Sequence, residues 1–229
     1  MPTAATDDRL PLRRARARRL GGLYAVTPDI ADTGELVARV EAALDGGASA
    51  IQYRNKTADP ARKRAQAAAL ARVHALRGGL FIVNDDAALA AAVGADGVHL
   101  GEDDGGIAAA RALLGPERII GVSCYDDFER ACAGVAAGAD YVAFGSFFPS
   151  SVKPGARRAA VELLGRAASL GVPVVAIGGI TAENAAGLQR AGAHAVAVIS
   201  AVFDAADVET AARAIASRWR RPSPAMHRT

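Results

Sequence analysis

The sequence predicts a (β/α)8 barrel, a TIM barrel, made by a single domain. Eight short apolar segments alternate along the chain with alanine-rich stretches that are long enough to form helices. Each segment is too continuously apolar for a strand with one solvated face, which indicates a parallel sheet covered by helices. The segments are residues 23–26, 50–53, 80–83, 97–100, 119–122, 141–144, 174–177 and 195–199.

A short repeat supports this order of elements. A glycine followed by alanine precedes the second, fourth, sixth and eighth segments, at Gly47, Gly94, Gly138 and Gly192. We expect each of these glycines to end a helix in the left-handed conformation, which glycine adopts without strain. A doubly wound open sheet is the alternative, but no G-x-G-x-x-G motif follows the first segment and no G-x-x-x-x-G-K-[ST] motif occurs.

Length and composition fit one globular domain. The chain has 229 residues, of which 51% are hydrophobic and 22% charged, and this excludes a disordered chain and a collagen-like fibre. No apolar run reaches the roughly eighteen residues of a membrane span, and the arginine-rich start lacks the apolar block of a secretory signal. We therefore expect no membrane partner and a cytoplasmic location. Cys124 and Cys132 match neither a redox pair nor a zinc site and are expected to be buried thiols.

Positive charge is concentrated at the two ends of the chain. Six arginines fall in the first twenty residues and four in the last twelve, whereas the body between them has more acidic than basic residues. We therefore divide the chain into a basic, flexible arm over residues 1–20, a barrel over 21–217 and a basic tail over 218–229. Solvated arms explain such charge, so no nucleic-acid partner is expected; weak contact with RNA or an anionic surface is the alternative.

The polar residues that follow each segment are the candidate site residues, because reactive groups in a TIM barrel project from the C-terminal ends of the strands. The second segment continues into Gln52, Arg54 and Lys56, which alternation along a strand places on one side. An amide and two cations at the barrel mouth suit a phosphate or a pyrophosphate. The alternative is a surface loop with ordinary solvated charges.

Carboxylates follow the third and fourth segments. Asn84 and Asp85 follow the third segment directly, and Asp104 lies in the acidic loop after the fourth. Carboxylates at neighbouring strand ends repel each other unless a cation lies between them, and oxygen ligands of this kind favour Mg²⁺. We therefore expect Asp85 and Asp104 to bind Mg²⁺. The alternatives are a helix N-cap at Asp86 and a solvated acidic loop, and His99 is expected to be a hydrogen-bonded core residue.

The fifth and sixth segments lead into residues with hydroxyl groups. Ser123 lacks the glycine that a nucleophile elbow requires two positions later, so we interpret it as a hydrogen-bond donor at the barrel mouth. The loop after the sixth segment contains Ser150 and Lys153, and we expect it to fold over a bound anion. The alternative role of Lys153 is that of a Schiff-base lysine, which would need a desolvated pocket.

The loops after the seventh and eighth segments are the usual phosphate site of this architecture. Gly178 allows the backbone to approach a ligand closely, and Thr181 followed by an acidic residue predicts the start of a helix whose amides point outward. Ile199 and Ser200 follow directly in the eighth unit. Together these loops predict a phosphorylated ligand.

Taken in order, six motifs make the chain resemble the thiamine-phosphate synthases over roughly residues 23–203. The motifs are Gln52-Tyr53-Arg54-Asn55-Lys56, Asn84-Asp85, Gly97-Val98-His99-Leu100-Gly101, Gly121-Val122-Ser123, Phe148-Pro149-Ser150 through Lys153, and Ala176-Ile177-Gly178-Gly179-Ile180. The resemblance implies a TIM-barrel transferase with two small-molecule substrates. It would join 4-amino-2-methyl-5-hydroxymethylpyrimidine diphosphate to a thiazole phosphate with Mg²⁺, releasing pyrophosphate and forming thiamine phosphate.

The resemblance also implies a role for each candidate residue. Gln52 would lie beside the pyrimidine and the pyrophosphate, and Asp85 and Asp104 would bind Mg²⁺. Ser123 would contact the pyrimidine substrate, and Ser150 would form a hydrogen bond within the closing loop. The residues implied to hold the pyrophosphate are Arg54, Lys56, Asn84 and Lys153, and those implied to hold a phosphate are Gly178, Ile199 and Ser200. The implied catalytic residues are Arg54, Lys56, Ser123 and Lys153.

Three positions depart from the family pattern. Glu102 stands where the family usually has glutamine, Ser146 where proline is common and Val152 where a threonine usually precedes the lysine. Loss of that threonine hydroxyl weakens phosphate binding by about 1 kcal/mol unless Ser151 replaces it. Two alternatives to the synthase therefore stay open, a thiazole tautomerase-like barrel and a non-catalytic phosphate-binding barrel. The sequence is also compatible with a homo-oligomer.

Overall fold

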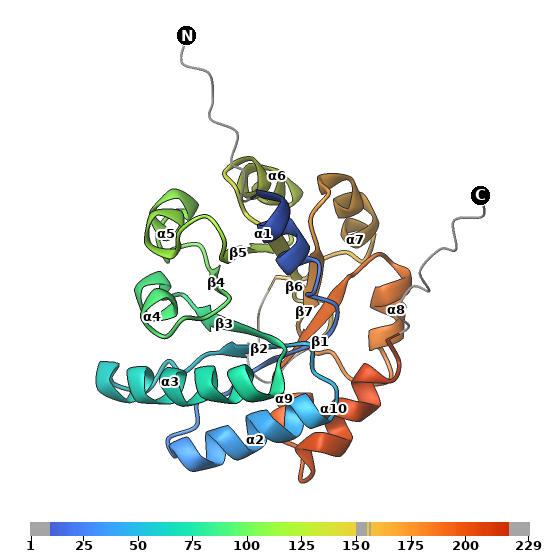
Figure 1. Ribbon diagram of the computed structural model, residues 1–229. Coiled ribbons are helices and arrows are strands. Elements are labelled where there is room, and N and C mark those ends of the chain that lie inside the picture. The colour runs from blue at the N-terminus through green and yellow to red at the C-terminus, as the bar shows by residue number, and fades with distance from the viewer. Residues whose placement is uncertain (1–9, 150–154, 156, 220–229) are drawn as a thin grey trace, which may run out of the picture.

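Eight parallel strands close into a barrel in the order in which they follow one another in the sequence, so β1 pairs with both β2 and β8 (Figure 1). The computed structural model describes residues 10–149, 155 and 157–219. Each predicted apolar segment gives one strand, and the predicted (β/α)8 barrel is confirmed. The strands are β1 (Gly22–Val26), β2 (Ala50–Tyr53), β3 (Leu80–Asn84), β4 (Gly97–Leu100), β5 (Ile119–Tyr125), β6 (Tyr141–Gly145), β7 (Val174–Ile177) and β8 (Ala195–Val198).

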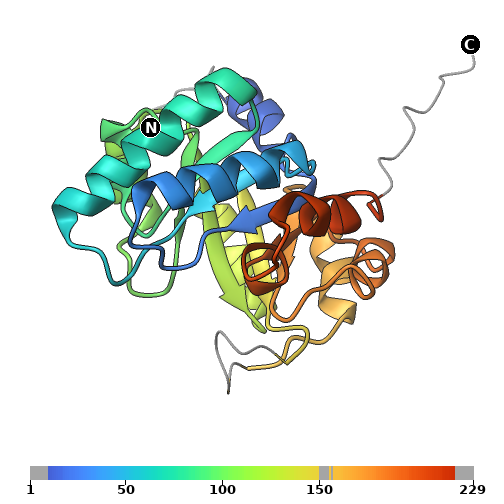
Figure 2. The same cartoon turned by 90° about the horizontal axis from the view of Figure 1, so that it is seen from below.

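Helices connect successive strands and form a ring around the barrel (Figure 1). They are α1 (Leu10–Ala17), α2 (Thr33–Asp45), α3 (Pro60–Arg77), α4 (Ala87–Ala92), α5 (Ile107–Leu114), α6 (Phe128–Ala136), α7 (Glu162–Ala167) with the 3₁₀ turn η1 (Ala168–Leu170), α8 (Ala185–Arg190), α9 (Ser200–Phe203) and α10 (Val208–Ala216). In Figure 2, α3, α2 and α10 lie side by side on the outside of the barrel. Across the described ranges, no helix combines the length and the apolar character that a membrane crossing requires.

Capping side chains fix where several helices begin. The side chains of Asp32, Asp59 and Asp127 accept hydrogen bonds from backbone N–H groups in the first turns of α2, α3 and α6. These N–H groups have no partner within the helix, so an aspartate at the N-cap stabilises each helix by about 1 kcal/mol. The aspartates therefore fix the residue at which each loop ends and its helix begins.

The four repeat glycines all adopt the conformation that the sequence predicts. Gly47, Gly94, Gly138 and Gly192 have φ values of 99°, 70°, 100° and 114°. A side chain at Gly192 would in addition place its Cβ 3.0 Å from the carbonyl oxygen of Leu164. Each glycine thus turns the chain back from a helix toward the next strand at a point where other residues are strained.

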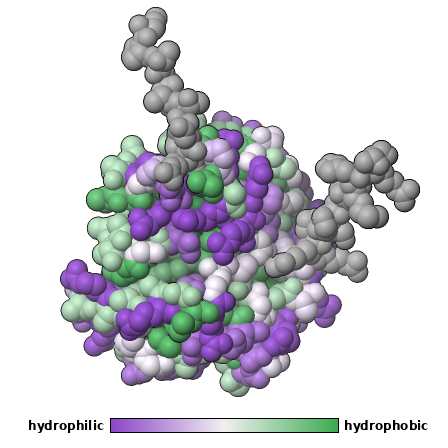
Figure 3. Space-filling model, viewed as in Figure 1, coloured by the Kyte–Doolittle hydropathy of each residue, from purple (hydrophilic) through white to green (hydrophobic). Residues whose placement is uncertain are grey.

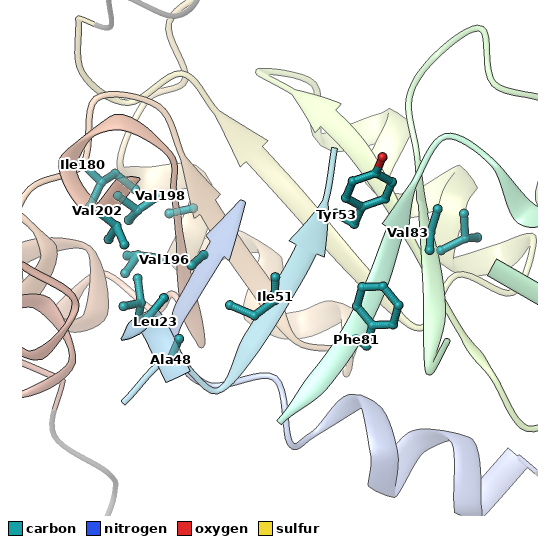
Figure 4. Close-up of a cluster of buried hydrophobic side chains, with 14 of the residues drawn as sticks. Leu23, Ala48, Ile51, Tyr53, Phe81, Val83, Ile180, Val196, Val198 and Val202 are labelled. Atoms are coloured by element: carbon teal, nitrogen blue, oxygen red, sulfur yellow. The ribbon is translucent and has the colours of Figure 1, made fainter. Parts of the chain in front are cut away.

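The strands bury side chains on both of their faces. Figure 4 shows one part of the outer layer, in which Ile51 and Tyr53 of β2 and Phe81 and Val83 of β3 project from neighbouring strands. The inner layer fills the barrel and consists of Ala17, Leu20, Tyr24, Val26, Ala50, Leu80, Ile82, Ile119, Tyr141, Ala143, Val175, Ala195 and Ala197. Because neither face of the strands is solvated, the apolar runs in the sequence are continuous rather than alternating.

Residues 10–17 form helix α1, which differs from the flexible arm predicted for residues 1–20. This helix lies over the end of the barrel where the strands begin (Figure 1), and hydrophilic side chains are prominent around it (Figure 3). Arg13 is buried and its Nε lies 2.6 Å from Oδ1 of Asp140, which also pairs with Arg111 at 2.7 Å. A buried carboxylate far along the chain thus pairs with Arg13 of this arginine-rich segment, and no local sequence pattern reveals that partner.

The first prediction concerns this buried ion pair. Replacement Arg13→Ala should lower the free energy of unfolding by about 2 kcal/mol, because Asp140 loses one of its two cationic partners in a buried setting. Arg14 is exposed on the same helix, so Arg14→Ala is the matched control and should stay within about 0.5 kcal/mol of the wild type. Urea unfolding followed by circular dichroism measures both. Equal losses in the two variants would contradict a specific role of Arg13.

Candidate active site

The predicted site residues that the structure describes gather at the C-terminal ends of the strands, which form one rim of the barrel. Gln52, Asn84 and Ser123 lie within the last part of β2, β3 and β5. The residues that directly follow a strand or lie in the loop after it are Arg54, Lys56, Asp85, Asp104, Gly178, Ile199 and Ser200. Ser150 and Lys153 lie outside the described residues.

Two carboxylates from the loops after β3 and β4 lie near an ammonium group from the loop after β2. Nζ of Lys56 lies 3.5 Å from Oδ2 of Asp85. Burial raises the pKa of Asp85 to about 6, and the neighbouring Asp104 adds to the rise through a hydrogen bond and its charge, while Lys56 opposes it. Oδ2 of Asp104 also accepts a hydrogen bond from the backbone N–H of Gly101 at 2.7 Å. The cluster thus holds two carboxylates that repel each other and that one lysine offsets only in part.

The backbone at Asp85 is held in a conformation that favours this position of its side chain. Asp85 has a φ of 64°, a left-handed value that a residue other than glycine adopts at some cost, and its N–H donates to the carbonyl oxygen of His99 at 2.8 Å. The next residue, Asp86, accepts a hydrogen bond from the N–H of Leu89 and is the N-cap of α4. The two adjacent aspartates therefore differ in role, since one caps the helix and the other faces the rim.

The loop after β2 is held by Asp29, a residue that sequence reasoning missed. Oδ1 of Asp29 lies 3.1 Å from Nη1 of Arg54 and accepts the backbone N–H of Lys56 at 2.9 Å. The hydroxyl of Thr27 donates a hydrogen bond to the carbonyl oxygen of Arg54 and accepts one from the backbone N–H of Arg54, each at 2.9 Å. Both partners come from the segment after β1, so the cationic loop is fixed by the neighbouring strand. Only the strand order could have revealed them, because nothing in their local sequence differs from an ordinary turn.

A chain of hydrogen bonds crosses the interior of the barrel and ends at two predicted site residues. Nε2 of Gln52 donates to the hydroxyl of Tyr24 at 2.7 Å, and the Tyr24 and Tyr141 hydroxyls lie 3.0 Å apart. The Tyr141 hydroxyl lies 3.0 Å from Nδ1 of His99, whose Nε2 lies 2.9 Å from Oγ of Ser123. His99 is thus a hydrogen-bonded core residue, as expected. We call these five residues the buried polar chain.

Sequence reasoning missed the two tyrosines of the buried polar chain. Tyr24 and Tyr141 lie in continuously apolar strands, where the sequence does not show which side chains face inward. The pairing of Val26 with Gln52 places alternate residues of β1, including Tyr24, on the same face as Gln52. Strand register was therefore the signal that could have found them.

The loops after β7 and β8 leave backbone groups close to the rim. Gly178 has a φ of 104°, and a side chain there would place its Cβ 2.2 Å from Oγ of Ser146. Ile199 is the N-cap residue of the short helix α9, which begins at Ser200. The helix predicted to start at Thr181 begins later, at Ala185, because the chain first makes a turn. At Gly178, close packing against Ser146 in the loop after β6 leaves no room for a side chain.

Two of the three departures from the family pattern have visible partners. Nη1 of Arg130 lies 3.3 Å from Oε1 of Glu102, and Nε of Arg130 donates to the carbonyl oxygen of Ser123 at 2.8 Å. The N–H of Ser146 donates to the carbonyl oxygen of Arg157 at 3.0 Å, a bond that proline could not make. Both departures thus take part in holding the rim. The third, Val152, lies outside the described residues.

The closed barrel and the charged groups at its strand ends define the class of protein, a TIM barrel with a candidate active site at its mouth. The sequence model described as thiamine monophosphate synthase matches residues 23–202, which is most of the chain. The chain therefore belongs to the thiamine monophosphate synthase family. As a member of that family it is a transferase of thiamine biosynthesis that acts on small-molecule substrates.

Individual relatives agree with this assignment. The chain is 57% identical over 198 residues to the thiamine-phosphate synthase of Chromobacterium violaceum, an alignment that covers 86% of this chain and 96% of the relative. It is 58% identical over 190 residues to the corresponding protein of Azoarcus sp. strain BH72, covering 82% and 92%. Among solved structures, thiamine phosphate pyrophosphorylase from Pyrococcus furiosus superimposes with a TM-score of 0.78 at 37% identity, covering 89% of this chain and 96% of that one.

The second prediction tests how the ionised carboxylate of Asp85 affects the stability of the fold. Its raised pKa means that the ionised form is disfavoured in the folded state, so its cost to stability is present above about pH 6 and disappears below about pH 4. Asp85→Asn should therefore be about 1 kcal/mol more stable than the wild type at pH 7 in the absence of divalent cations, and equal to it at pH 4. Urea unfolding at several pH values measures the difference.

Asp103 provides the matched control because its side chain is exposed in the loop after β4. Asp103→Asn should stay within about 0.5 kcal/mol of the wild type at each pH. An Asp85→Asn variant that is less stable than the wild type at pH 7 would show that the ionised carboxylate stabilises the fold instead.

Proposed function

We propose that this enzyme condenses 4-amino-2-methyl-5-hydroxymethylpyrimidine diphosphate with 4-methyl-5-(2-phosphooxyethyl)thiazole, forming thiamine phosphate and releasing pyrophosphate in a Mg²⁺-assisted reaction. The family supports the overall activity, and the relatives named above are thiamine-phosphate synthases. The observation that supports the diphosphate substrate and the need for Mg²⁺ is the cluster of Asp85, Asp104 and Lys56 at the ends of neighbouring strands. It combines the ligands of a hard cation with a group that binds an anion.

The donor set fits Mg²⁺ held between the protein and a substrate. No group of three side chains with metal-ligating character occurs among residues 10–149, 155 and 157–219. Two carboxylates, Asp85 and Asp104, therefore suit an ion that takes the rest of its ligands from phosphate oxygens and water, as Mg²⁺ commonly does. Burial raises the pKa of Asp85 and the neighbouring Asp104 raises it further, and a cation between the two carboxylates would relieve their repulsion.

The chemistry requires charge stabilisation and positioning rather than a protein nucleophile. The C–O bond to the pyrophosphate breaks heterolytically, and the aminopyrimidine delocalises the positive charge left on its methylene carbon. The thiazole nitrogen then forms the new C–N bond. Bound Mg²⁺ would neutralise charge that develops on the departing pyrophosphate. This dissociative course explains why the described part of the site contains cations and amides but no serine–histidine–acid triad.

The chain's own residues divide the remaining work. Arg54 is oriented by Asp29 through one nitrogen, so its other N–H groups are left to donate to the pyrophosphate. Lys56 would move from Asp85 toward the same anion, and Lys153 would contact it from the loop after β6. The phosphate of the thiazole substrate would bind the backbone near Gly178 and the start of α9, where this fold commonly holds phosphate. Gln52, Asn84, Ser123 and Ser150 would complete the contacts to the pyrimidine diphosphate.

The third prediction is a direct assay. Purified protein given both substrates and Mg²⁺ should form thiamine phosphate and pyrophosphate in equal amounts, and a chelator should abolish turnover. Asp85→Asn should lower Mg²⁺-dependent turnover by at least about 100-fold while the protein stays folded.

Failure of the assay would distinguish the alternatives. No product under conditions in which the Chromobacterium violaceum relative works would contradict the proposal. Isomerisation of a thiazole without condensation would indicate a tautomerase, although such an enzyme needs no pyrophosphate clamp. Binding of both substrates without turnover would indicate a non-catalytic barrel.

The fourth prediction concerns Lys153. If it stabilises charge on the departing pyrophosphate, Lys153→Ala should lower kcat by about 100-fold and change the KM for the thiazole phosphate by less than about threefold. Lys63 lies on the outer helix α3, so Lys63→Ala is the matched control and should leave both constants unchanged. Single-turnover kinetics separate the chemical step from product release. A large rise in KM with kcat unchanged would assign Lys153 to ground-state binding.

A further inference from the structure

The buried polar chain has a direction that its Gln52 end determines. The amide nitrogen of Gln52 can only donate, so the Tyr24 hydroxyl accepts there and points its own proton toward the Tyr141 hydroxyl. The Tyr141 oxygen accepts that proton and lies 3.0 Å from Nδ1 of His99, so its own proton is left to donate to Nδ1, the direction in which every hydroxyl of the chain donates once. A neutral imidazole whose Nδ1 accepts carries its proton on Nε2, and this N–H donates to Oγ of Ser123.

Burial and the available partners keep each group in the protonation state that this direction requires. Gln52, Tyr24, Tyr141 and His99 are all at least nine-tenths buried. Both ring nitrogens of His99 lie within hydrogen-bond distance of a hydroxyl, Tyr141 at 3.0 Å and Ser123 at 2.9 Å, so one ring proton satisfies both contacts. Burial raises the pKa of both tyrosines, so each hydroxyl keeps its proton. The chain therefore has one donor and one acceptor at every internal link.

Packing holds the rings of the chain in place. The Tyr141 ring is stacked on His99 with centroids 5.5 Å apart and meets Tyr24 edge to face at 6.3 Å. Gly121, opposite Tyr141 in the neighbouring strand, leaves the space for this ring: a Cβ there would lie 1.9 Å from Cζ of the tyrosine. The barrel interior is thus built around a polar path rather than filled by aliphatic side chains alone.

We propose that Tyr24, Tyr141 and His99 are positioning residues that fix the hydrogen-bonding pattern which Gln52 and Ser123 present to the ring of the pyrimidine substrate. Because Oγ of Ser123 accepts from His99, its hydroxyl proton is free to be donated into the barrel mouth. Because the amide nitrogen of Gln52 is bonded to Tyr24, its amide oxygen is the atom presented as an acceptor.

This pattern selects the chemical class of the ring. An aminopyrimidine carries an exocyclic amine that donates and ring nitrogens that accept, so it matches an acceptor at Gln52 and a donor at Ser123. A 4-oxo pyrimidine reverses the pattern at these positions, since its exocyclic oxygen accepts and the adjacent ring nitrogen carries a proton. The inference rests on the proposed function, which places the pyrimidine at this part of the rim. Mismatched polar groups in a buried site are rejected strongly.

The fifth prediction has a first arm that needs no substrate. In protein labelled with ¹⁵N-histidine, NMR should show His99 with a protonated Nε2 and an unprotonated Nδ1, the signals being assigned by their loss in His99→Gln. Tyr141→Phe removes the donor to Nδ1 and should shift His99 toward a mixture of the two tautomers. Ile119→Val changes another inner-layer residue, at the opposite end of the barrel, and should leave the His99 signals unchanged.

The second arm measures substrate selection. Tyr141→Phe should raise the KM for the aminopyrimidine diphosphate by about 3- to 10-fold, the effect of one hydrogen bond, and leave the KM for the thiazole phosphate within twofold. The preference for the amino over the 4-oxo pyrimidine diphosphate should fall by a similar factor. Ser123→Ala should raise the same KM and lower the same preference. Adding Tyr141→Phe to Ser123→Ala should change them little further, because both substitutions interrupt the same chain of hydrogen bonds. Ile119→Val should change neither KM.

The outcomes separate this inference from the proposed function. A wild type with Nδ1 protonated, or a Tyr141→Phe variant with unchanged His99 signals and unchanged selectivity, would overturn the role of the buried polar chain even if thiamine phosphate is formed. Absence of thiamine phosphate from the wild type would reject the proposed function and with it the identity of the ring. Additive losses in the double variant, with equal effects on both KM values, would show that Tyr141 has only a structural role.

Discussion

The repulsion between the carboxylates of Asp85 and Asp104 is the interaction on which the rest of the site depends. Burial and this repulsion together raise the pKa of Asp85, and the salt bridge with Lys56 offsets them only in part. The barrel tolerates the arrangement because parallel strand ends converge there and the backbone at Asp85 is held by a hydrogen bond to His99. A site that is unfavourable when empty of cations is one that binds a cation with its accompanying anion favourably.

The two ends of the barrel differ in how completely their buried or partly buried carboxylates are paired with cations. At the end where the strands begin, Asp140 is buried between Arg13 and Arg111, and its charge is fully paired. At the other end, the side chain of Lys56 is more than half exposed. Its partner Asp85 forms no ion pair with a second cation among the described residues. The ion pairs of Asp140 are thus held by burial, whereas the more exposed pair of Lys56 and Asp85 at the rim can exchange its contacts for others.

Much of the fold could be predicted from sequence, because each βα unit repeats the same local signals. Continuous apolar strands and left-handed glycines such as Gly94 identified the units and their order. The candidate residues near the rim, such as Asp85, could also be found, since a TIM barrel places its site there. What could not be predicted depends on partners distant in the sequence. Arg13 of helix α1 pairs with Asp140, which lies far away in the sequence, and the two tyrosines of the buried polar chain can be placed only from strand register.

The buried polar chain gives a physical reason for the composition of the barrel interior. Two tyrosine hydroxyls, an amide and an imidazole replace aliphatic groups that would have packed without any need for hydrogen-bond partners. Such a network stabilises a fold only when every member is satisfied, and it then specifies one arrangement of its ends. Its ends are Gln52 and Ser123, both near the rim, so the hydrogen-bond order of the core extends to the part of the rim where we propose that the pyrimidine binds. Gly121 is part of the same design, because no larger residue would leave room for Tyr141.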